Sequence, residues 1–142
     1  MQGTKALFSI ACIFFILLGC VPALAHEMAE KRAIEAADTW LKLIDAHQYT
    51  KSWETAAELF KNGISMEQWK QSLNAARRPL GKVTKRTVKS KQYTTSLPGA
   101  PDGQYVVIQY ETSFENKKSS VETVTPMLDK DGKWRVSGYY IK

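Results

Sequence analysis

The chain has 142 residues, which is the length of a single domain. It carries 20 basic and 14 acidic side chains, a net charge of +6, and its only two cysteines are Cys12 and Cys20. A disulfide framework, a cysteine nucleophile and a thiolate metal site are therefore excluded from everything beyond residue 20.

The first 25 residues are predicted to be a secretory signal, and residues 26–142 a single domain. Lys5 precedes an apolar run shorter than the roughly 20 residues of a membrane span. Pro22 and the small residues Ala23 and Ala25 follow it, a pattern typical of cleavage before His26. The sequence LLGC, which ends at Cys20, also fits a lipoprotein signal. The protein is thus expected to be periplasmic or secreted after cleavage at Ala25-His26, or anchored as a lipoprotein at Cys20.

Three helices are predicted next. The first covers residues 29–46, where apolar residues recur at helical spacing. Thr50 is expected to cap the second, which ends at Asn62-Gly63. Ser65 and Gln68 form a capping-box pattern for the third, which Pro79 and Gly81 stop. The buried faces are expected to contain Ala33, Ala37, Trp40, Leu41, Ile44, Trp53, Ala56, Ala57, Phe60, Met66, Trp69, Leu73 and Ala76.

From residue 82 the apolar period changes to two, which predicts four antiparallel strands: residues 82–93, 104–114, 119–128 and 133–142. A turn centred on Asn116-Lys117 would pair Tyr110 with Thr123. A turn over residues 129–132 would pair Val121 with Tyr140. The predicted fold class is therefore α+β, with helices covering one face of a four-stranded meander.

These registers predict which residues share a face of the sheet. The face under the helices is expected to collect Val106, Ile108, Tyr110, Phe114, Val121, Met127, Trp134, Val136 and Tyr140. The other face is expected to collect Tyr105, Gln109, Glu111, Glu122, Lys133, Arg135, Ser137 and Tyr139, with Glu111 directly opposite Glu122. Tyr105, Val107, Tyr139 and Ile141 also offer apolar area there for a homodimer.

Four stretches carry a family resemblance: residues 40–53 (WLKLIDAHQYTKSW), 77–83 (RRPLGKV), 97–114 and 131–142 (DGKWRVSGYYIK). The chain resembles a bacterial family of exported proteins known as domain-of-unknown-function family 4019, of NTF2-like, or cystatin-like, architecture. That resemblance implies three helices on a curved sheet that together form a cone, and an export route. It brings no catalytic residues. His47 stands where a glycine is expected after the first helix.

Acid/base chemistry is the enzymatic alternative, because ketosteroid-isomerase-like enzymes share this architecture. Its candidates are the Glu111–Glu122 pair with Tyr139 nearby, together with Asp38 and Asp45. A solvated charge cluster is the favoured interpretation of these acids, so no catalytic residue is assigned. Residues 26–142 contain only two histidines and no metal-binding motif, so neither metal nor cofactor is expected.

Aromatic side chains are the richest feature of the chain and have two interpretations. Large side chains supply the buried area that a small domain needs. A cone lined by such residues is also typical of a small-molecule pocket. The candidates for both roles are Trp40, Tyr49, Trp53, Trp69, Tyr110, Trp134 and Tyr140.

Residues 68–101 contain eight basic and no acidic residues. The predicted basic patch consists of Arg77, Arg78, Lys82, Lys85, Arg86, Lys89 and Lys91. Arg77 sits at the helix-to-strand corner and is expected to bind helix-end carbonyls or a carboxylate. Since an exported protein meets little nucleic acid, the patch is better suited to an anionic lipid surface or an acidic partner protein.

The sequence therefore predicts an exported, NTF2-like, non-enzymatic module that binds a small apolar ligand or an envelope protein. An acid/base enzyme of isomerase or dehydratase type, and an envelope-docking protein that uses its basic strand, are the alternatives.

Overall fold

The computed structural model describes residues 21–142. Residues 1–20, with Cys12, Cys20 and most of the predicted signal segment, lie outside the described residues. Four helices precede a four-stranded antiparallel sheet, which confirms the α+β class. The elements are α1 (Val21–Asp45), α2 (Tyr49–Glu54), α3 (Glu58–Gly63), α4 (Met66–Ala76), a short 3-10 turn η1 (Arg78–Leu80), β1 (Val83–Thr94), β2 (Tyr105–Phe114), β3 (Lys117–Leu128) and β4 (Trp134–Ile141).

The second predicted helix is divided in two, so the described residues contain four α-helices rather than three. Helix α2 ends at Glu54, and Ala57 adopts an extended conformation before α3 begins. The Ala57 N–H donates to the carbonyl of Val136 in β4 at 2.9 Å. A hydrogen bond to a distant strand thus replaces the helical one, which local helix propensity could not indicate.

The junctions around the helices follow the sequence prediction more closely. Ser65 and Gln68 form the predicted capping box of α4. His47 has a φ of 57°, so it occupies the left-handed position where a glycine was expected. Gly81 has a φ of 78°, and a Cβ added there would lie 2.7 Å from the carboxylate of Glu115. Only glycine fits that corner, where the chain turns from η1 into β1 against the β2–β3 turn.

The sheet is a meander in the order β1-β2-β3-β4, as predicted, but both predicted registers are wrong. Tyr110 pairs with Glu122, and Glu111 pairs with Val121. The cause is a shorter β2–β3 connection: Phe114 pairs with Lys117, so only two residues form the turn. Further along, Thr125 pairs with Gly138 but Pro126 with Val136, so β4 contains a bulge.

These shifts change which side chains face the helices. Glu122 and Tyr139 lie on the covered face, and Glu111 and Glu122 are not opposite each other. Tyr140 is 55 % exposed on the outer face. Val121 and Met127 likewise leave the predicted apolar face, because each pairs opposite an outward-facing residue. The predicted turn lengths were therefore not enough to give the correct pairing of the strands.

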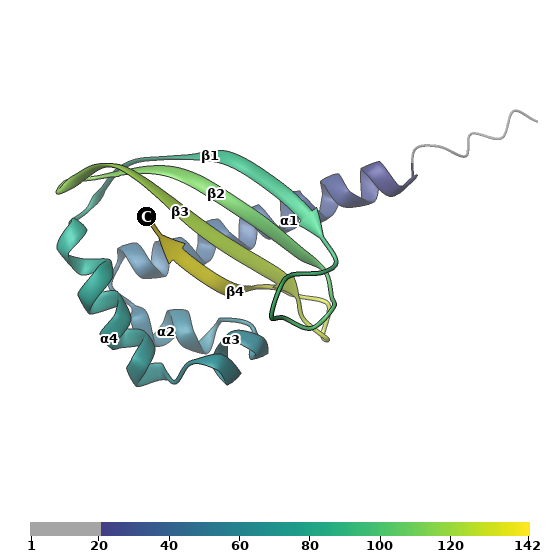
Figure 1. Cartoon of the computed structure of the whole chain (residues 1–142), viewed down its shortest axis with the longest axis horizontal. Coiled ribbons are helices and arrows are strands. Elements are labelled where there is room, and N and C mark those ends of the chain that lie inside the picture. Colours follow the sequence, from purple (N-terminus) through teal and green to yellow (C-terminus); the bar gives the residue numbers. More distant parts are fainter. Residues whose placement is uncertain (1–20) are drawn as a thin grey trace, which may run out of the picture.

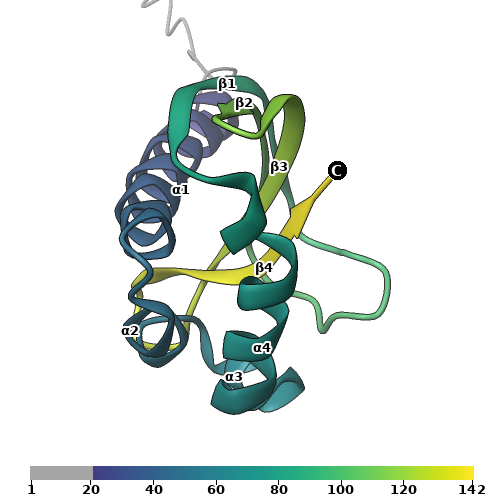
Figure 2. The same cartoon turned by 90° about the vertical axis from the view of Figure 1, so that its left-hand side faces the viewer.

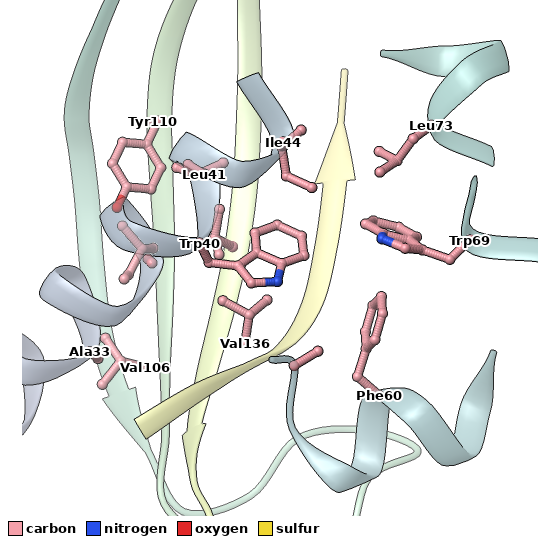
Figure 3. Close-up of a cluster of buried hydrophobic side chains, with 14 of the residues drawn as sticks. Ala33, Trp40, Leu41, Ile44, Phe60, Trp69, Leu73, Val106, Tyr110 and Val136 are labelled. Carbon is pink, nitrogen blue, oxygen red and sulfur yellow. The ribbon is translucent and has the colours of Figure 1, made fainter. Parts of the chain in front are cut away.

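Helix α1 runs beneath the arching strands and contacts all four of them, as Figure 1 shows. Helices α2, α3 and α4 lie together at one end of the molecule, below β4 (Figures 1 and 2). Trp69 from α4 and Phe60 from α3 point toward Trp40 of α1 (Figure 3), with ring centroids 4.9–6.4 Å apart. Within residues 21–142, no helix combines the length and apolar character that a membrane span requires.

Candidate functional site

Arg86 of β1 lies at the centre of a charge network beneath the sheet. Its Nη1 and Nη2 donate to the two carboxylate oxygens of Asp45 at 2.7 and 3.0 Å. Its Nε donates to Oε1 of Glu122 at 2.7 Å. Burial opposes the charge of Arg86, but the hydrogen bonds to Asp45 and Glu122 outweigh it and raise the pKa of Arg86. One guanidinium thereby joins α1 to β3 across the edge of the sheet.

Arg77, which is 1 % exposed, adds a second guanidinium. It donates to Oδ1 of Asp45 at 3.1 Å and to the carbonyl of Gly81 at 2.7 Å, which confirms its predicted role at the corner. Its guanidinium also stacks on Phe114, 4.5 Å from the ring centroid. Burial opposes ionisation of Asp45, but Arg86 and Arg77 together hold the pKa of Asp45 below its ordinary value.

Glu122 is fully buried and accepts three hydrogen bonds. Besides Arg86, Thr112 donates to its Oε1 at 2.6 Å and Tyr139 to its Oε2 at 2.5 Å. Burial, followed by the charge and hydrogen bond of Glu122, raises the pKa of the Tyr139 phenol. Two carboxylates and two guanidiniums balance each other, so the network needs no ligand to be electrically neutral.

A buried carboxylate beside a phenol is also what an acid/base enzyme would place in such a fold. A general base must reach the proton that it removes. Glu122 is fully buried and is absent from the lining of three depressions on the surface of the described residues, and protein donors bind both of its oxygens. The geometry therefore favours a structural role for this carboxylate.

A polar depression of about 440 Å³ lies beside the network. Asp38 and Tyr110 form one wall, where the Tyr110 hydroxyl donates to Asp38 at 2.8 Å. Burial and the neighbouring Asp38 raise the pKa of Tyr110. Asp45 and Arg86 form another part of the lining, so the two aspartates proposed as acid/base candidates border one depression while both are already hydrogen-bonded.

A larger groove of about 700 Å³ lies where α1 passes α2 and the start of β4. Its lining is mostly apolar, with the half-buried Leu43 and Trp134 and the edges of Trp40 and Val136. Four cationic residues from three different parts of the chain surround this floor. They are Arg32, Lys51, Lys133 and Arg135, and Glu35 is the one acidic lining residue.

The seven aromatic candidates occupy different environments. Trp40, Tyr49, Trp69 and Tyr110 are buried, Trp53 and Trp134 are half-buried, and Tyr140 is exposed. Protein acceptors bind three of the indole N–H groups: Trp40 donates to Ser52 O at 2.8 Å, Trp53 to Ile64 O at 2.8 Å, and Trp69 to Ser52 Oγ at 3.0 Å. Only Trp40 and Trp134 line the groove, and only Tyr110 lines the polar depression.

The predicted basic patch does not form one surface. Arg77 and Arg86 turn inward to the network. Lys89 lies 3.8 Å from Glu111, and Lys91 lies 3.2 Å from Glu30 of α1. The remaining members, Arg78, Lys82 and Lys85, are exposed around the corner and the start of β1.

Sequence reasoning missed both the network and the cationic rim of the groove. The available signal for the network was composition: residues 68–101 contain three arginines and no acid, in a chain with enough acids elsewhere to pair with them. For the rim there was no comparable signal, because Arg32, Lys51 and Lys133 are far apart in the sequence and each looks like an ordinary surface charge. No group of three metal-binding side chains occurs within the described range 21–142.

The described residues thus form an α+β domain in which helices cover a four-stranded meander. The domain contains an internally balanced charge network and an apolar groove. The chain belongs to the family described as "Protein of unknown function (DUF4019)", whose model matches residues 36–139. The family resemblance found in the sequence is thereby confirmed. No curated protein and no solved structure matched the chain.

Proposed function

We propose that this protein is an exported, non-enzymatic binding module of NTF2-like, cone-shaped architecture, which takes a small ligand with an apolar body in the groove between α1 and β4. The observation that carries the proposal is the groove itself. It combines a volume of about 700 Å³ with a mostly apolar lining, which suits a ligand-binding site.

The interior of the fold supports a surface groove as the site better than an internal pocket. Trp40, Phe60 and Trp69 pack against one another, with Tyr139 at 5.4 Å from Trp40 between ring centroids. Trp40, Phe60 and Trp69 are turned toward one another beside β4 (Figure 3) and belong to the buried core, against which Tyr139 packs. An apolar ligand therefore finds its accessible apolar area on the groove floor.

Export is part of this proposal and rests on the sequence pattern of residues 1–25. A cleavage before His26 would fall within α1 as it stands. It would leave His26, whose ring stacks on Tyr93 at 4.3 Å, at the new N-terminus. Mass spectrometry of the N-terminal peptide distinguishes this product from one that begins with a lipidated Cys20.

A homodimer through the outer face of the sheet has less support than a ligand in the groove. Tyr105 is fully buried and donates to the carbonyl of Pro101 at 2.6 Å, and Tyr139 faces the helices. Ile141 pairs with Glu122 and so shares its covered face. Three of the four residues expected to form the dimer are therefore unavailable on the outer face. An envelope-docking surface on β1 is likewise reduced, because Arg77 and Arg86 are engaged inside.

Titration with phenylnaphthylamine, a neutral fluorescent probe with an apolar body, tests the groove. We expect saturable binding by the purified protein. Ala36→Gln introduces a polar amide into the groove lining and should weaken binding about tenfold, which corresponds to ~1.4 kcal/mol. Ala75→Gln makes the same change on the exposed face of α4, away from the groove, and should leave binding unchanged. Absence of binding, or equal binding by both variants, would overturn the proposal.

A further inference from the structure

We propose that the ligand of the groove is a single amphipathic anion: an apolar body that lies on the groove floor, joined to a carboxylate, sulfonate or phosphate that the rim cations bind. This inference rests on the proposed function, because it specifies the chemistry of the ligand in the same groove. It is carried by the combination of an apolar floor with a rim of predominantly one sign of charge.

The rim cations come from three separate elements. Arg32 lies on α1, Lys51 on α2, and Lys133 immediately before β4. All three side chains are exposed. Within residues 21–142, none of them lies within 4.0 Å of a carboxylate oxygen in the salt bridges that the structure contains. Their charge is therefore available to an external anion.

Arg135 provides the internal comparison. It lines the same groove, but its guanidinium donates to Asp131 at 2.8 Å from both terminal nitrogens and to Asp129 at 3.0 Å. The chain thus pairs Arg135 of β4 with the two aspartates of the β3–β4 turn and leaves the other three cations unpaired. Glu35 is the single carboxylate in the lining, so a cationic ligand would meet mostly repulsion.

The apolar floor separates this site from a simple phosphate site and from a membrane surface. Inorganic phosphate has no apolar part to cover Leu43 and Trp134. An intact bilayer presents its head groups outward and its apolar chains inward, so it could use the rim but would leave the floor in water. A single amphiphile satisfies both, because its apolar body removes floor area from water while its head group meets the cations.

Two probes with one skeleton test the head group. Anilinonaphthalenesulfonate is phenylnaphthylamine with one sulfonate added. At low salt we expect the sulfonate probe to bind the purified protein about tenfold more tightly than the neutral probe. This preference should decrease with added salt, since the rim is exposed. In the double variant Lys51→Gln, Lys133→Gln the preference should disappear, while binding of the neutral probe is retained.

Lys85→Gln, Lys89→Gln is the matched control, because it removes the same charge from β1, away from the groove. It should keep the preference for the sulfonate probe. A preference that is lost in this control but persists in the groove variant would overturn the inference. Equal binding of the two probes by the wild-type protein would overturn the anionic head group and leave the proposed function intact. Failure of both probes to bind would overturn both.

Competition identifies the form in which the amphiphile is bound. Dodecanoate below its micelle concentration should displace the sulfonate probe, and inorganic phosphate at the same concentration should not. Displacement by phosphatidylglycerol vesicles in the absence of displacement by dodecanoate would overturn the inference in favour of membrane docking.

Discussion

The charge network and the groove both gather cations from distant parts of the chain, but they use them in opposite ways. Arg77 is buried and Arg86 half-buried; both bind Asp45, and Arg86 also binds Glu122. Arg32, Lys51 and Lys133 are exposed around an apolar floor. A cation that is paired with a carboxylate of the same chain stabilises the fold. A cation that is unpaired and lies beside exposed apolar area is suited to bind a ligand. Variants of each region should therefore separate stability from binding.

The largest expected effect is that of Glu122→Gln. It removes the charge that faces Arg86 in a fully buried position, and breaking a buried ion pair in this way costs about 3 kcal/mol or more. Urea unfolding of the variant should show this loss. Glu111→Gln is the control on the neighbouring strand, since Glu111 is exposed and lies 3.8 Å from Lys89. Its unfolding free energy should change by less than about 0.5 kcal/mol. Equal effects would mean that Glu122 is not buried and paired as described.

The second effect separates two neighbouring tyrosines in β4. Tyr139→Phe removes a hydrogen bond to a buried carboxylate, which is worth about 2 kcal/mol. Tyr140→Phe changes an exposed hydroxyl and should alter the unfolding free energy by less than about 0.5 kcal/mol. Thermal or urea unfolding of the pair measures the difference. The reverse order would restore the register expected from the sequence, in which Tyr140 faces the helices.

The network also predicts how stability depends on pH. Since Arg86 and Arg77 lower the pKa of Asp45 below its ordinary value of 3.8, the stabilisation is present above that pH. It is lost as the pH falls below 3.8 through the folded-state pKa. Asp45→Asn should therefore make the decline of unfolding free energy below pH 3.8 less steep. If the unfolding free energy of this variant declined below pH 3.8 as steeply as that of the wild-type protein, Asp45 would not be stabilised as a carboxylate.

The smallest effect on stability is expected at the groove. Lys51→Gln, Lys133→Gln should change the unfolding free energy by less than about 0.5 kcal/mol, because the side chains are exposed, although it should abolish the preference for the anionic probe. A loss of several kcal/mol of unfolding free energy in this double variant would contradict the account, because it would mean that the rim cations stabilise the fold as the network cations do.

The helices and strands themselves could largely be predicted, because apolar periodicity and caps are local. Ser65 and Gln68 act through neighbours in the sequence, and the positive φ of Gly81 is likewise a local backbone requirement, although its approach to Glu115 is not. The division of α2 from α3 could not be predicted, because it depends on the hydrogen bond from Ala57 to Val136 in the last strand. The strand faces were mispredicted for Glu122 and Tyr139, because a shorter turn and a bulge change the side of the sheet without changing the apolar pattern much.

The candidate sites could be predicted from the sequence even less well than the strand faces. The ion pairs of the network join residues 32 to 41 positions apart, and nothing in the sequence indicates which acid an arginine will meet. The basic stretch from Arg77 to Lys91 suggested one surface, but two of its three arginines, Arg77 and Arg86, point inward to the network. The aromatic candidates were predicted as core or pocket, and their positions divide between the core, the groove and the outer face.

Tryptophan resonances test the central claim most directly, because the chain has four tryptophans, two of which line the groove. In two-dimensional nitrogen–proton NMR spectra, titration with phenylnaphthylamine should shift the indole signal of Trp134 most and that of Trp40 less. The signals of Trp53 and Trp69, whose N–H groups bind Ile64 and Ser52 inside the fold, should remain in place. Shifts confined to Trp53 and Trp69 would contradict the account, because the ligand would then lie in the interior and not in the groove.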